Sequence, residues 1–249
     1  MFRKNGRQLL RYAFFGDIHG NLEALNAVLN AMSILSVDEY ICLGDIVGYG
    51  ANPQECVNMI RELKPLAVVG NHDHAATGHI DVRYFNQYAR LAALWTREQL
   101  DESSRNWLAS LPFVEHAENF SIAHGSLQSP EVFNYVQTLK HAEYNFEAMD
   151  KPLLVLGHSH QTVMFFDTNP ITFGFESKEL IDPLSKTIVN CGSVGQPRDE
   201  DPRASFMIYD DSKQEVCIHR IEYDFISAQA KIRSAGLPES LALRLPLGK

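Results

Sequence analysis

Residues 11–21, with the sequence Arg-Tyr-Ala-Phe-Phe-Gly-Asp-Ile-His-Gly-Asn, set a pattern that the rest of the chain repeats. A short apolar run ends at Gly16, polar side chains follow at Asp17 and His19, and apolar residues at helical spacing start at Leu22. The run predicts a strand over 11–16, and the spacing predicts a helix from 22 to about 32. A loop with polar side chains lies between them.

The same pattern recurs twice. A predicted strand over 39–44 ends in Gly44-Asp45, a predicted helix over 53–63 has a proline in its first turn, and a predicted strand over 66–70 precedes Asn71. In an open α/β sheet, ligands bind in the crevice at the carboxyl ends of the strands. We therefore expect the three strand ends to form one site.

The second half of the chain is richer in predicted strands and is expected to be antiparallel in part. A helical pattern covers residues 84–111, and its aromatic residues are expected in the core or as a cap over the site. Strands are then predicted over 119–124, 153–157, 161–166, 187–190, 204–209 and 215–223. Helices are predicted over 142–149 and 225–234. Residues 1–249 are predicted to form a single α/β domain, with 236–249 as a loosely packed tail.

The composition is that of a globular protein, with 45% hydrophobic and 21% charged residues. A net charge of -9 disfavours broad attraction to nucleic acids or anionic membranes. The sequence contains no apolar run of about 20 residues and no export signal at its start. The four cysteines are widely spaced, with no CxxC pair. These features predict a cytoplasmic protein with reduced thiols and no membrane contact.

Side chains able to bind metal ions gather in five clusters. These are Asp17-Ile18-His19-Gly20-Asn21, Gly44-Asp45, Gly70-Asn71-His72-Asp73, His124-Gly125 and Gly157-His158-Ser159-His160. Asp-x-His and His-x-His spacing lets two ligands reach one ion. A single Gly-Asp after a strand is often a helix cap, but five clusters at strand ends favour a metal site. Carboxylate, imidazole and amide ligands without thiolate suit manganese, iron, zinc, nickel or cobalt.

The five clusters, in this order, resemble the motifs of the calcineurin-like metallophosphoesterase family, which run Asp-x-His, Gly-Asp, Gly-Asn-His-Asp/Glu, His and Gly-His-x-His. The resemblance implies a four-layer sandwich of two mixed β-sheets flanked by helices, with two metal ions at the strand ends. It also implies a ligand set in which the first ion is held by Asp17, His19 and His160, the bridging ligand is Asp45, and the second ion is held by Asn71, His124 and His158.

The first cluster and residues 190–198 are similar to the compact prokaryotic phosphodiesterase branch of this family, which includes relatives of diadenosine tetraphosphatases. In that branch a proline often stands where this chain has Cys191, a departure expected to alter the turn and not the metals. The segment 192–195, Gly-Ser-Val-Gly, fits a tight turn as well as a substrate contact.

The predicted mechanism needs no side-chain nucleophile. Two ions about 3.5–4 Å apart lower the pKa of a shared water, and the hydroxide attacks phosphorus in line. Manganese is the favoured metal. His72 follows the ligand Asn71 but is assigned to no ion, so it is the candidate acid for the leaving oxygen, with Asp73 or Asp45 orienting its ring.

Three further residues are candidates for substrate binding. The resemblance suggests Asn21, and Arg198 and Arg203 follow a turn where a guanidinium could bind a second phosphate. Taken alone, each arginine fits slightly better as a solvated charge that balances the acidic residues 199–201.

The sequence therefore predicts a dinuclear, metal-dependent phosphoesterase acting on a phosphodiester or a dinucleoside polyphosphate, with a small phosphorylated molecule such as a nucleotide as its partner. The alternatives are a metal-dependent nuclease, which the acidic charge disfavours, and a protein-binding scaffold that has lost catalysis. The sequence makes no prediction of oligomeric state.

Overall fold

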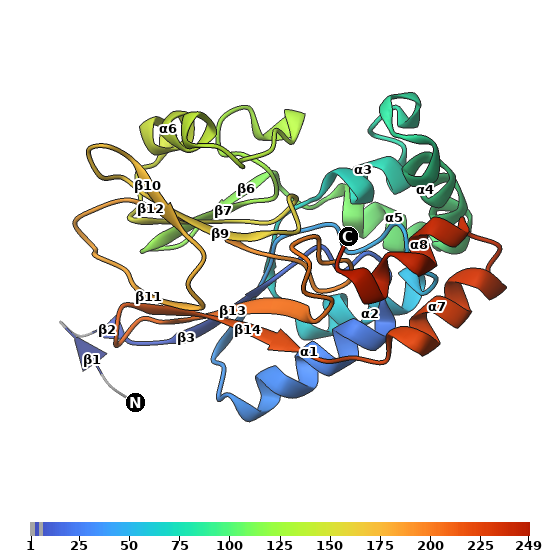
Figure 1. Ribbon diagram of the computed structural model, residues 1–249, viewed down its shortest axis with the longest axis horizontal. Coiled ribbons are helices and arrows are strands. Elements are labelled where there is room, and N and C mark those ends of the chain that lie inside the picture. The colour runs from blue at the N-terminus through green and yellow to red at the C-terminus, as the bar shows by residue number, and fades with distance from the viewer. Residues whose placement is uncertain (1–2, 5–6) are drawn as a thin grey trace.

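The computed structural model describes residues 3–4 and 7–249, and two facing β-sheets form its middle (Figure 1). The first sheet has the order β10 (Thr172–Gly174), β9 (Thr162–Phe166), β12 (Thr187–Cys191), β8 (Leu153–Leu156), β7 (Phe120–Ala123) and β6 (Val114–His116). The second has the order β11 (Lys178–Leu180), β14 (Glu215–Ile221), β13 (Ala204–Asp210), β3 (Arg11–Phe15), β4 (Glu39–Cys42) and β5 (Leu66–Ala67). A separate pair joins β1 (Arg3–Lys4) to β2 (Arg7–Gln8).

Helices cover the outer faces of both sheets. The helix α6 (Leu139–Ala148) lies over the first sheet, and α1 (Leu22–Ile34) and α2 (Pro53–Leu63) lie over the second, while α7 (Phe225–Ser234) packs against α1 (Figure 1). At one end of the molecule, α3 (Asn71–Thr77) contacts α4 (Gln87–Gln99) and α5 (Glu102–Ala109). The remaining helical segments are η1 (Val82–Tyr84), η2 (Pro130–Val132), α8 (Glu239–Leu243) and η3 (Leu245–Leu247).

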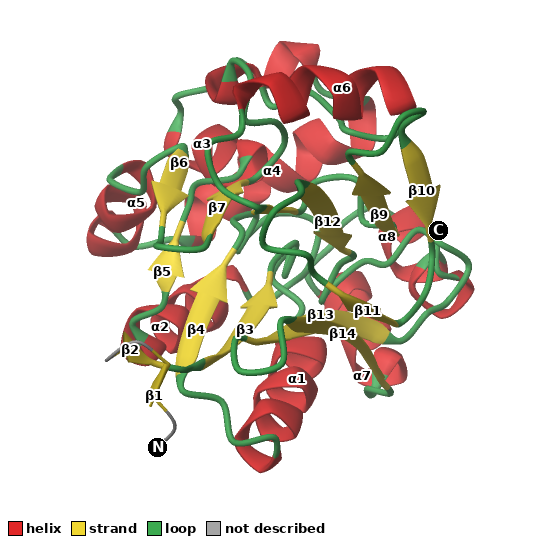
Figure 2. Cartoon of the chain, turned by 90° about the vertical axis from the view of Figure 1, so that its left-hand side faces the viewer, coloured by secondary structure: helices red, strands yellow, loops and turns green. Residues whose placement is uncertain are grey.

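Both sheets are mixed. In the second sheet β3, β4 and β5 run parallel (Figure 2), whereas β13 is antiparallel to β3. In the first sheet β7, β8 and β12 are parallel, and β9 is antiparallel to β12. The structure thus confirms the predicted four-layer α/β sandwich. Among the described residues, no helix has the length and apolar character needed to cross a bilayer.

Successive side chains of β3 point to opposite faces of its sheet, so the strand contributes to two separate cores. Phe14 points into the core between the sheets, where it meets Phe120 at a ring-centroid distance of 4.9 Å. Its neighbours Ala13 and Phe15 are buried on the opposite face, in the core that α1 and α2 complete. A strand with both faces buried is held in one register, because a slip of one residue would exchange the two faces.

Two expectations about helices differ from the structure. The predicted helix over 84–111 is divided, because Asp101 accepts a hydrogen bond from the Ser104 backbone N–H at 2.6 Å and starts α5 as a new helix. Residues 236–249 are packed rather than loose. Leu237, Leu241 and Leu245 recur at the helical spacing of four residues and are buried against α7.

Candidate metal centre

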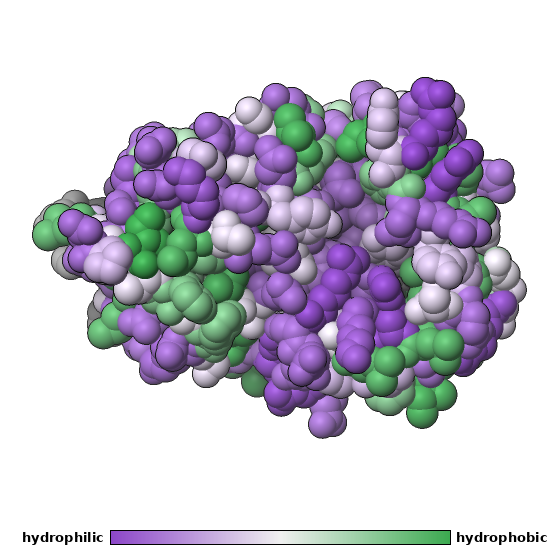
Figure 3. Space-filling model, turned by 45° about the horizontal axis from the view of Figure 1, so that its top comes forward, coloured by the Kyte–Doolittle hydropathy of each residue, from purple (hydrophilic) through white to green (hydrophobic). Residues whose placement is uncertain are grey.

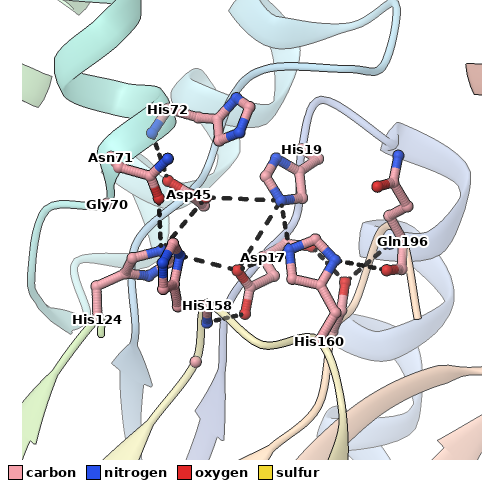
Figure 4. A network of polar contacts seen from close by, with 12 residues as sticks. Asp17, His19, Asp45, Gly70, Asn71, His72, His124, His158, His160 and Gln196 are labelled. Carbon is pink, nitrogen blue, oxygen red and sulfur yellow. Dashed lines mark hydrogen bonds and ion pairs between the residues drawn. The ribbon is translucent and has the colours of Figure 1, made fainter. Parts of the chain in front are cut away.

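The predicted metal ligands all follow strands that end at the same place, between the two sheets. Asp17 and His19 follow β3, and Asp45 follows β4. The ligands after β5, β7 and β8 are Asn71, His124, His158 and His160. Figure 4 shows these side chains converging from strands that lie far apart in the sequence.

The carboxylate and imidazole ligands form two overlapping groups. The first contains Asp17, His19, Asp45 and His160, and the second contains Asp45, His124 and His158, with the ligand atoms of each group within 4.8 Å of one another. Asp45 belongs to both groups. The amide oxygen of Asn71 lies 3.2 Å from His124 Nε2, which places it beside the second group.

Three of the histidines are oriented by hydrogen bonds from Nδ1 to backbone carbonyls. The acceptors are Val47 O for His19 (3.1 Å), Leu43 O for His124 (2.7 Å) and Gln196 O for His160 (2.6 Å). A carbonyl oxygen can only accept, so Nδ1 carries the proton in each ring. Once a ring is neutral, its Nε2 has a lone pair that faces the centre, the arrangement in which proteins present imidazole to a metal.

The two carboxylates use their oxygen atoms unequally. Asp17 Oδ2 accepts the His158 backbone N–H at 2.9 Å, and Asp45 Oδ1 accepts the His72 backbone N–H at 2.8 Å. The other oxygens, Asp17 Oδ1 and Asp45 Oδ2, are buried without a hydrogen-bond partner. A buried carboxylate oxygen without a partner is costly, and a cation between the two would satisfy both.

The imidazoles support the same conclusion. His19 Nε2 lies 3.0 Å from His160 Nε2, although both rings donate from Nδ1 and present lone pairs to each other. His160 Nε2 is also 3.3 Å from Asp17 Oδ1. Several acceptors that face one another in a buried place fit a shared divalent cation, and the mixture of carboxylate, imidazole and amide fits an ion that prefers oxygen and nitrogen.

The backbone at these residues is unusual. Asp17, His19, Asp45, His158 and His160 have positive φ angles between 49° and 68°. The left-handed region costs a residue other than glycine about 1–2 kcal/mol, and such strain tends to occur at functional sites.

The glycines of the motifs allow close approach to the carboxylates. A Cβ on Gly70 would lie 2.1 Å from Asp45 Oδ1, and a Cβ on Gly157 would lie 2.7 Å from Asp17 Oδ2. Both distances are too short for a side chain. Glycine is therefore required at these two positions, where the chain passes close to Asp45 and Asp17 of other clusters.

Asp45 and His124 hold opposite charges. Burial alone would raise the pKa of Asp45, but His124 and the other imidazoles hold that pKa well below its usual range. Burial would lower the pKa of His124, but the charge of Asp45 raises it to about 9. Since imidazole binds a metal only without its second proton, metal binding at His124 is expected to release a proton.

His72 lies beside the centre, with its ring packed against other rings. Its centroid is 4.9 Å from His19, 4.4 Å from Tyr49 and 5.0 Å from Phe85. Burial lowers the pKa of His72 to about 4, with Asp45 opposing the shift. The ring is therefore neutral near pH 7, able to donate one hydrogen bond to an oxygen in the site.

Asp73 does not contact His72 in the way predicted. Its carboxylate accepts three backbone N–H groups, from Gly70 at 3.0 Å, Ile46 at 2.9 Å and Val47 at 3.2 Å. These bonds join the loop after β4 to the start of α3. They give Asp73 a positioning role in place of the predicted catalytic one.

Asn21 also has a structural role in place of the predicted contact with substrate. Its Oδ1 accepts the Ala24 N–H at 3.1 Å and caps α1, and its Nδ2 donates to Gly195 O at 2.9 Å. Both ends of the amide are thus engaged inside the protein.

The two arginines have different surroundings. Arg198 is half-buried, lies 5.8 Å from the centroid of the Tyr49 ring, and contributes with burial to lowering the pKa of His160. It therefore lies beside the metal centre. Arg203 pairs with Asp201 at 2.6 Å on the surface, which favours the alternative of a balanced surface charge over a phosphate contact.

The segment 192–195 supports the first ligand loop. Ser193 Oγ donates to Asp17 O at 2.8 Å, and the N–H of Gly195 donates to the same oxygen at 2.9 Å. The turn therefore holds Asp17 in place. The sequence identifies this segment but not the backbone carbonyl of Gln196, which orients His160. Every residue has a backbone carbonyl, so the residue types do not show which one accepts a hydrogen bond.

Comparisons with known proteins agree with this geometry. Over 241 residues the chain is 40% identical to an uncharacterized protein of Methanocaldococcus jannaschii, with 95% of this chain and 98% of that protein covered. It is 28% identical over 130 residues to a symmetrical bis(5'-nucleosyl)-tetraphosphatase of Actinobacillus pleuropneumoniae, with 50% of this chain and 47% of that protein covered.

The chain also matches a solved structure and a family model over most of its length. The crystal structure of a metallophosphoesterase from Sphaerobacter thermophilus matches with a TM-score of 0.87 and 39% identity, covering 97% of this chain and 100% of that one. Residues 10–214 match the model of the calcineurin-like phosphoesterase superfamily domain. This match includes every predicted metal ligand, and the chain belongs to the calcineurin-like phosphoesterase superfamily.

Proposed function

We propose that the protein hydrolyses a phosphodiester or a dinucleoside polyphosphate with two divalent metal ions. The observation that carries the proposal is the position of Asp45, which belongs to both ligand groups and has a buried oxygen without a hydrogen-bond partner. Manganese is the favoured metal, and the same oxygen and nitrogen ligands without thiolate also suit iron, zinc, nickel or cobalt.

In this proposal the side chains have separate roles. Asp17, His19 and His160 would hold one ion, Asn71, His124 and His158 would hold the other, and Asp45 lies where it could serve both. Two such ions would activate a water and stabilise the charge that develops on the phosphoryl oxygens. The Nδ1 bonds keep Nε2 of His19, His124 and His160 aimed at the centre, so these three ligands are oriented before any ion binds.

His72 and Arg198 act on the substrate. His72 stabilises the leaving oxygen by donating a hydrogen bond from its neutral ring, since the ring lies next to the centre and is not tied to Asp73. Arg198 holds a second phosphate or a non-bridging oxygen with its guanidinium. Asp73 keeps the loop of His72 in place.

The preference for diesters and dinucleoside polyphosphates rests on two supports. One is the relationship to symmetrical bis(5'-nucleosyl)-tetraphosphatases over half of the chain. The other is Arg198, which adds positive charge beside the centre, as a substrate with more than one phosphate group requires. The alternative of a scaffold without catalysis is disfavoured because the complete ligand set converges. The cytoplasmic location stays a prediction.

A hydrolysis screen tests the proposal. The protein is loaded with manganese, its metal content is measured by elemental analysis, and turnover is compared on a phosphomonoester, a phosphodiester, diadenosine tetraphosphate and a single-stranded oligonucleotide. We expect two ions per chain and the highest kcat/KM on the diester or the tetraphosphate. A preference for the monoester would refute the substrate assignment, and faster cleavage of the oligonucleotide would favour the nuclease.

A further inference from the structure

Two sizeable cavities lie near the metal centre, and only one opens on its ligands. The first, of about 500 Å³, is lined by Asn71, His72 and His158 together with aromatic residues. The second, of about 690 Å³, lies along β9 and β10 and includes none of the predicted ligands. It belongs to the end of the molecule where Figure 3 shows apolar residues gathered, whereas hydrophilic residues surround the hollow at the middle of this face. Both volumes fall within the range of small-molecule sites, roughly 300–1,000 Å³.

The first cavity, called the aromatic cleft below, has one aromatic wall on each side. Tyr84 and Phe85 form one wall, and Phe133 and Tyr135 form the other. Tyr84 is 88% exposed although it is a large aromatic side chain. Exposed aromatic residues that line a cavity beside a reactive centre are suited to stacking with a flat ligand.

Residues of the proposed centre support the walls of the cleft. The ring of Tyr135 stacks on the ligand His158 with centroids 3.9 Å apart and an interplanar angle of 15°. On the other wall, the ring of Phe85 packs on His72 at 5.0 Å. A group bound between these walls would therefore lie directly beside the scissile bond.

The cleft and the surroundings of Arg198 differ in charge. Among the described residues that line it, Glu131 is the only acidic or basic side chain apart from the histidines. Arg198 does not line the cleft but lies over the ring of Tyr49, which does. A phosphate chain would be repelled by Glu131 and attracted by Arg198, whereas an uncharged aromatic group with hydrogen-bond donors suits the cleft.

We propose that the aromatic cleft binds the nucleoside of the substrate, with the base stacked on Tyr84 and the phosphates directed towards Arg198. This inference rests on the proposed function and extends it, because it assigns the substrate a nucleoside and a single orientation in the site. Stacking explains why the walls combine aromatic rings from segments with no motif in common, since every base has a flat face that such rings can cover.

Binding measurements on the manganese-loaded protein test the inference. AMP and ribose 5-phosphate carry the same phosphate and sugar and differ only in the base. We expect calorimetry to show roughly tenfold or tighter binding of AMP, the usual gain from stacking one base. Equal affinities of the two ligands would overturn the proposal.

Variants place the effect in the cleft. Tyr84→Ala removes the exposed ring, and Val132→Trp fills the cleft from a side chain that is 58% exposed, so both proteins are expected to fold. Both should lower the affinity for AMP towards that for ribose 5-phosphate, and Tyr84→Phe should keep it. The matched control is Tyr88→Ala, because Tyr88 is 48% exposed and lines a different cavity with Leu91 and Trp95.

The outcomes also separate this inference from the proposed function. Unchanged preference for AMP in both cleft variants would overturn the nucleoside site even if the wild type hydrolyses diesters. Absence of hydrolysis with two bound ions would refute the proposed function, whereas loss of the preference for AMP in the cleft variants would still support the nucleoside site.

Discussion

The metal centre and the aromatic cleft lie side by side but are built in opposite ways. At the centre, Asp17 and Asp45 are buried and held by backbone hydrogen bonds within loops that end strands. The cleft shares Asn71, His72 and His158 with the motifs, but its aromatic walls come from the segment around η1 and from the long connection after β7, and they range from 88% exposed at Tyr84 to 7% at Phe133. Chelation requires ligands at fixed spacing, whereas stacking requires only a flat surface. This difference explains why the centre leaves motifs in the sequence and the aromatic walls of the cleft leave none.

The largest expected effect comes from breaking the centre with Asp45→Ala. This change removes the one carboxylate shared by both ligand groups and the acceptor for the His72 N–H. We expect less than two ions per chain by elemental analysis and almost no turnover on any phosphate ester, while Asp201→Ala on the surface should retain both. Wild-type turnover in Asp45→Ala, or full activity with one ion, would contradict the dinuclear centre.

The sequence predicts the layers and the centre for the same physical reason. Apolar runs that end in Gly-Asp or Gly-Asn are typical of buried strands followed by polar loops, so the pattern alone places Asp17, Asp45 and Asn71 at one edge of a sheet. The polar helix α3 was not predicted, because residues 71–77 have almost no apolar periodicity and the helix is stabilised by the carboxylate of Asp73.

Side-chain roles outside the centre were less predictable. A residue type shows which groups a side chain can bind, but it does not show which neighbouring residue the side chain already binds in the folded protein. Arg198 and Arg203 look alike in the sequence, yet Arg203 is paired with Asp201, two residues earlier. Asn21 likewise has both polar atoms engaged, by a helix N-terminus and by a turn that is distant in the chain.

The next effect concerns the boundary between centre and cleft, where His72 contacts both. We expect His72→Ala to retain both ions but to lose roughly two to three orders of magnitude in kcat on esters with poor leaving groups, the usual loss when one donor to a developing oxyanion is removed. Nitrophenyl esters should be affected less, since nitrophenolate is stable without that hydrogen bond. Turnover and metal content are measured on the same preparation. A parallel fall in metal content would show that His72 is a ligand.

The two arginines provide a smaller and more selective effect. Arg198→Ala is expected to lower kcat/KM about 10- to 100-fold on diadenosine tetraphosphate, the loss that corresponds to a hydrogen bond to a charged group. A phosphomonoester should be affected less, because it offers no second phosphate. Arg203→Ala is the matched control and should leave both values within about twofold, as is usual for an exposed ion pair. An Arg198→Ala variant that stays within about twofold on the tetraphosphate, like Arg203→Ala, would show that Arg198 does not bind phosphate.

The smallest expected effect is that of Asn21→Ala. This variant tests whether Asn21 only supports the fold or also contacts the substrate. The change removes the cap of α1 and leaves the buried carbonyl of Gly195 without its donor. Loss of a cap costs about 0.5–2 kcal/mol, which lowers Tm by a few degrees in a chain of this size. Asn21→Ser keeps an oxygen for the Ala24 N–H and should recover the part of the loss that belongs to the cap, while neither variant should change KM. A KM raised about tenfold at an unchanged Tm would instead place Asn21 against the substrate, since a side chain that only supports the fold has no contact to lose there.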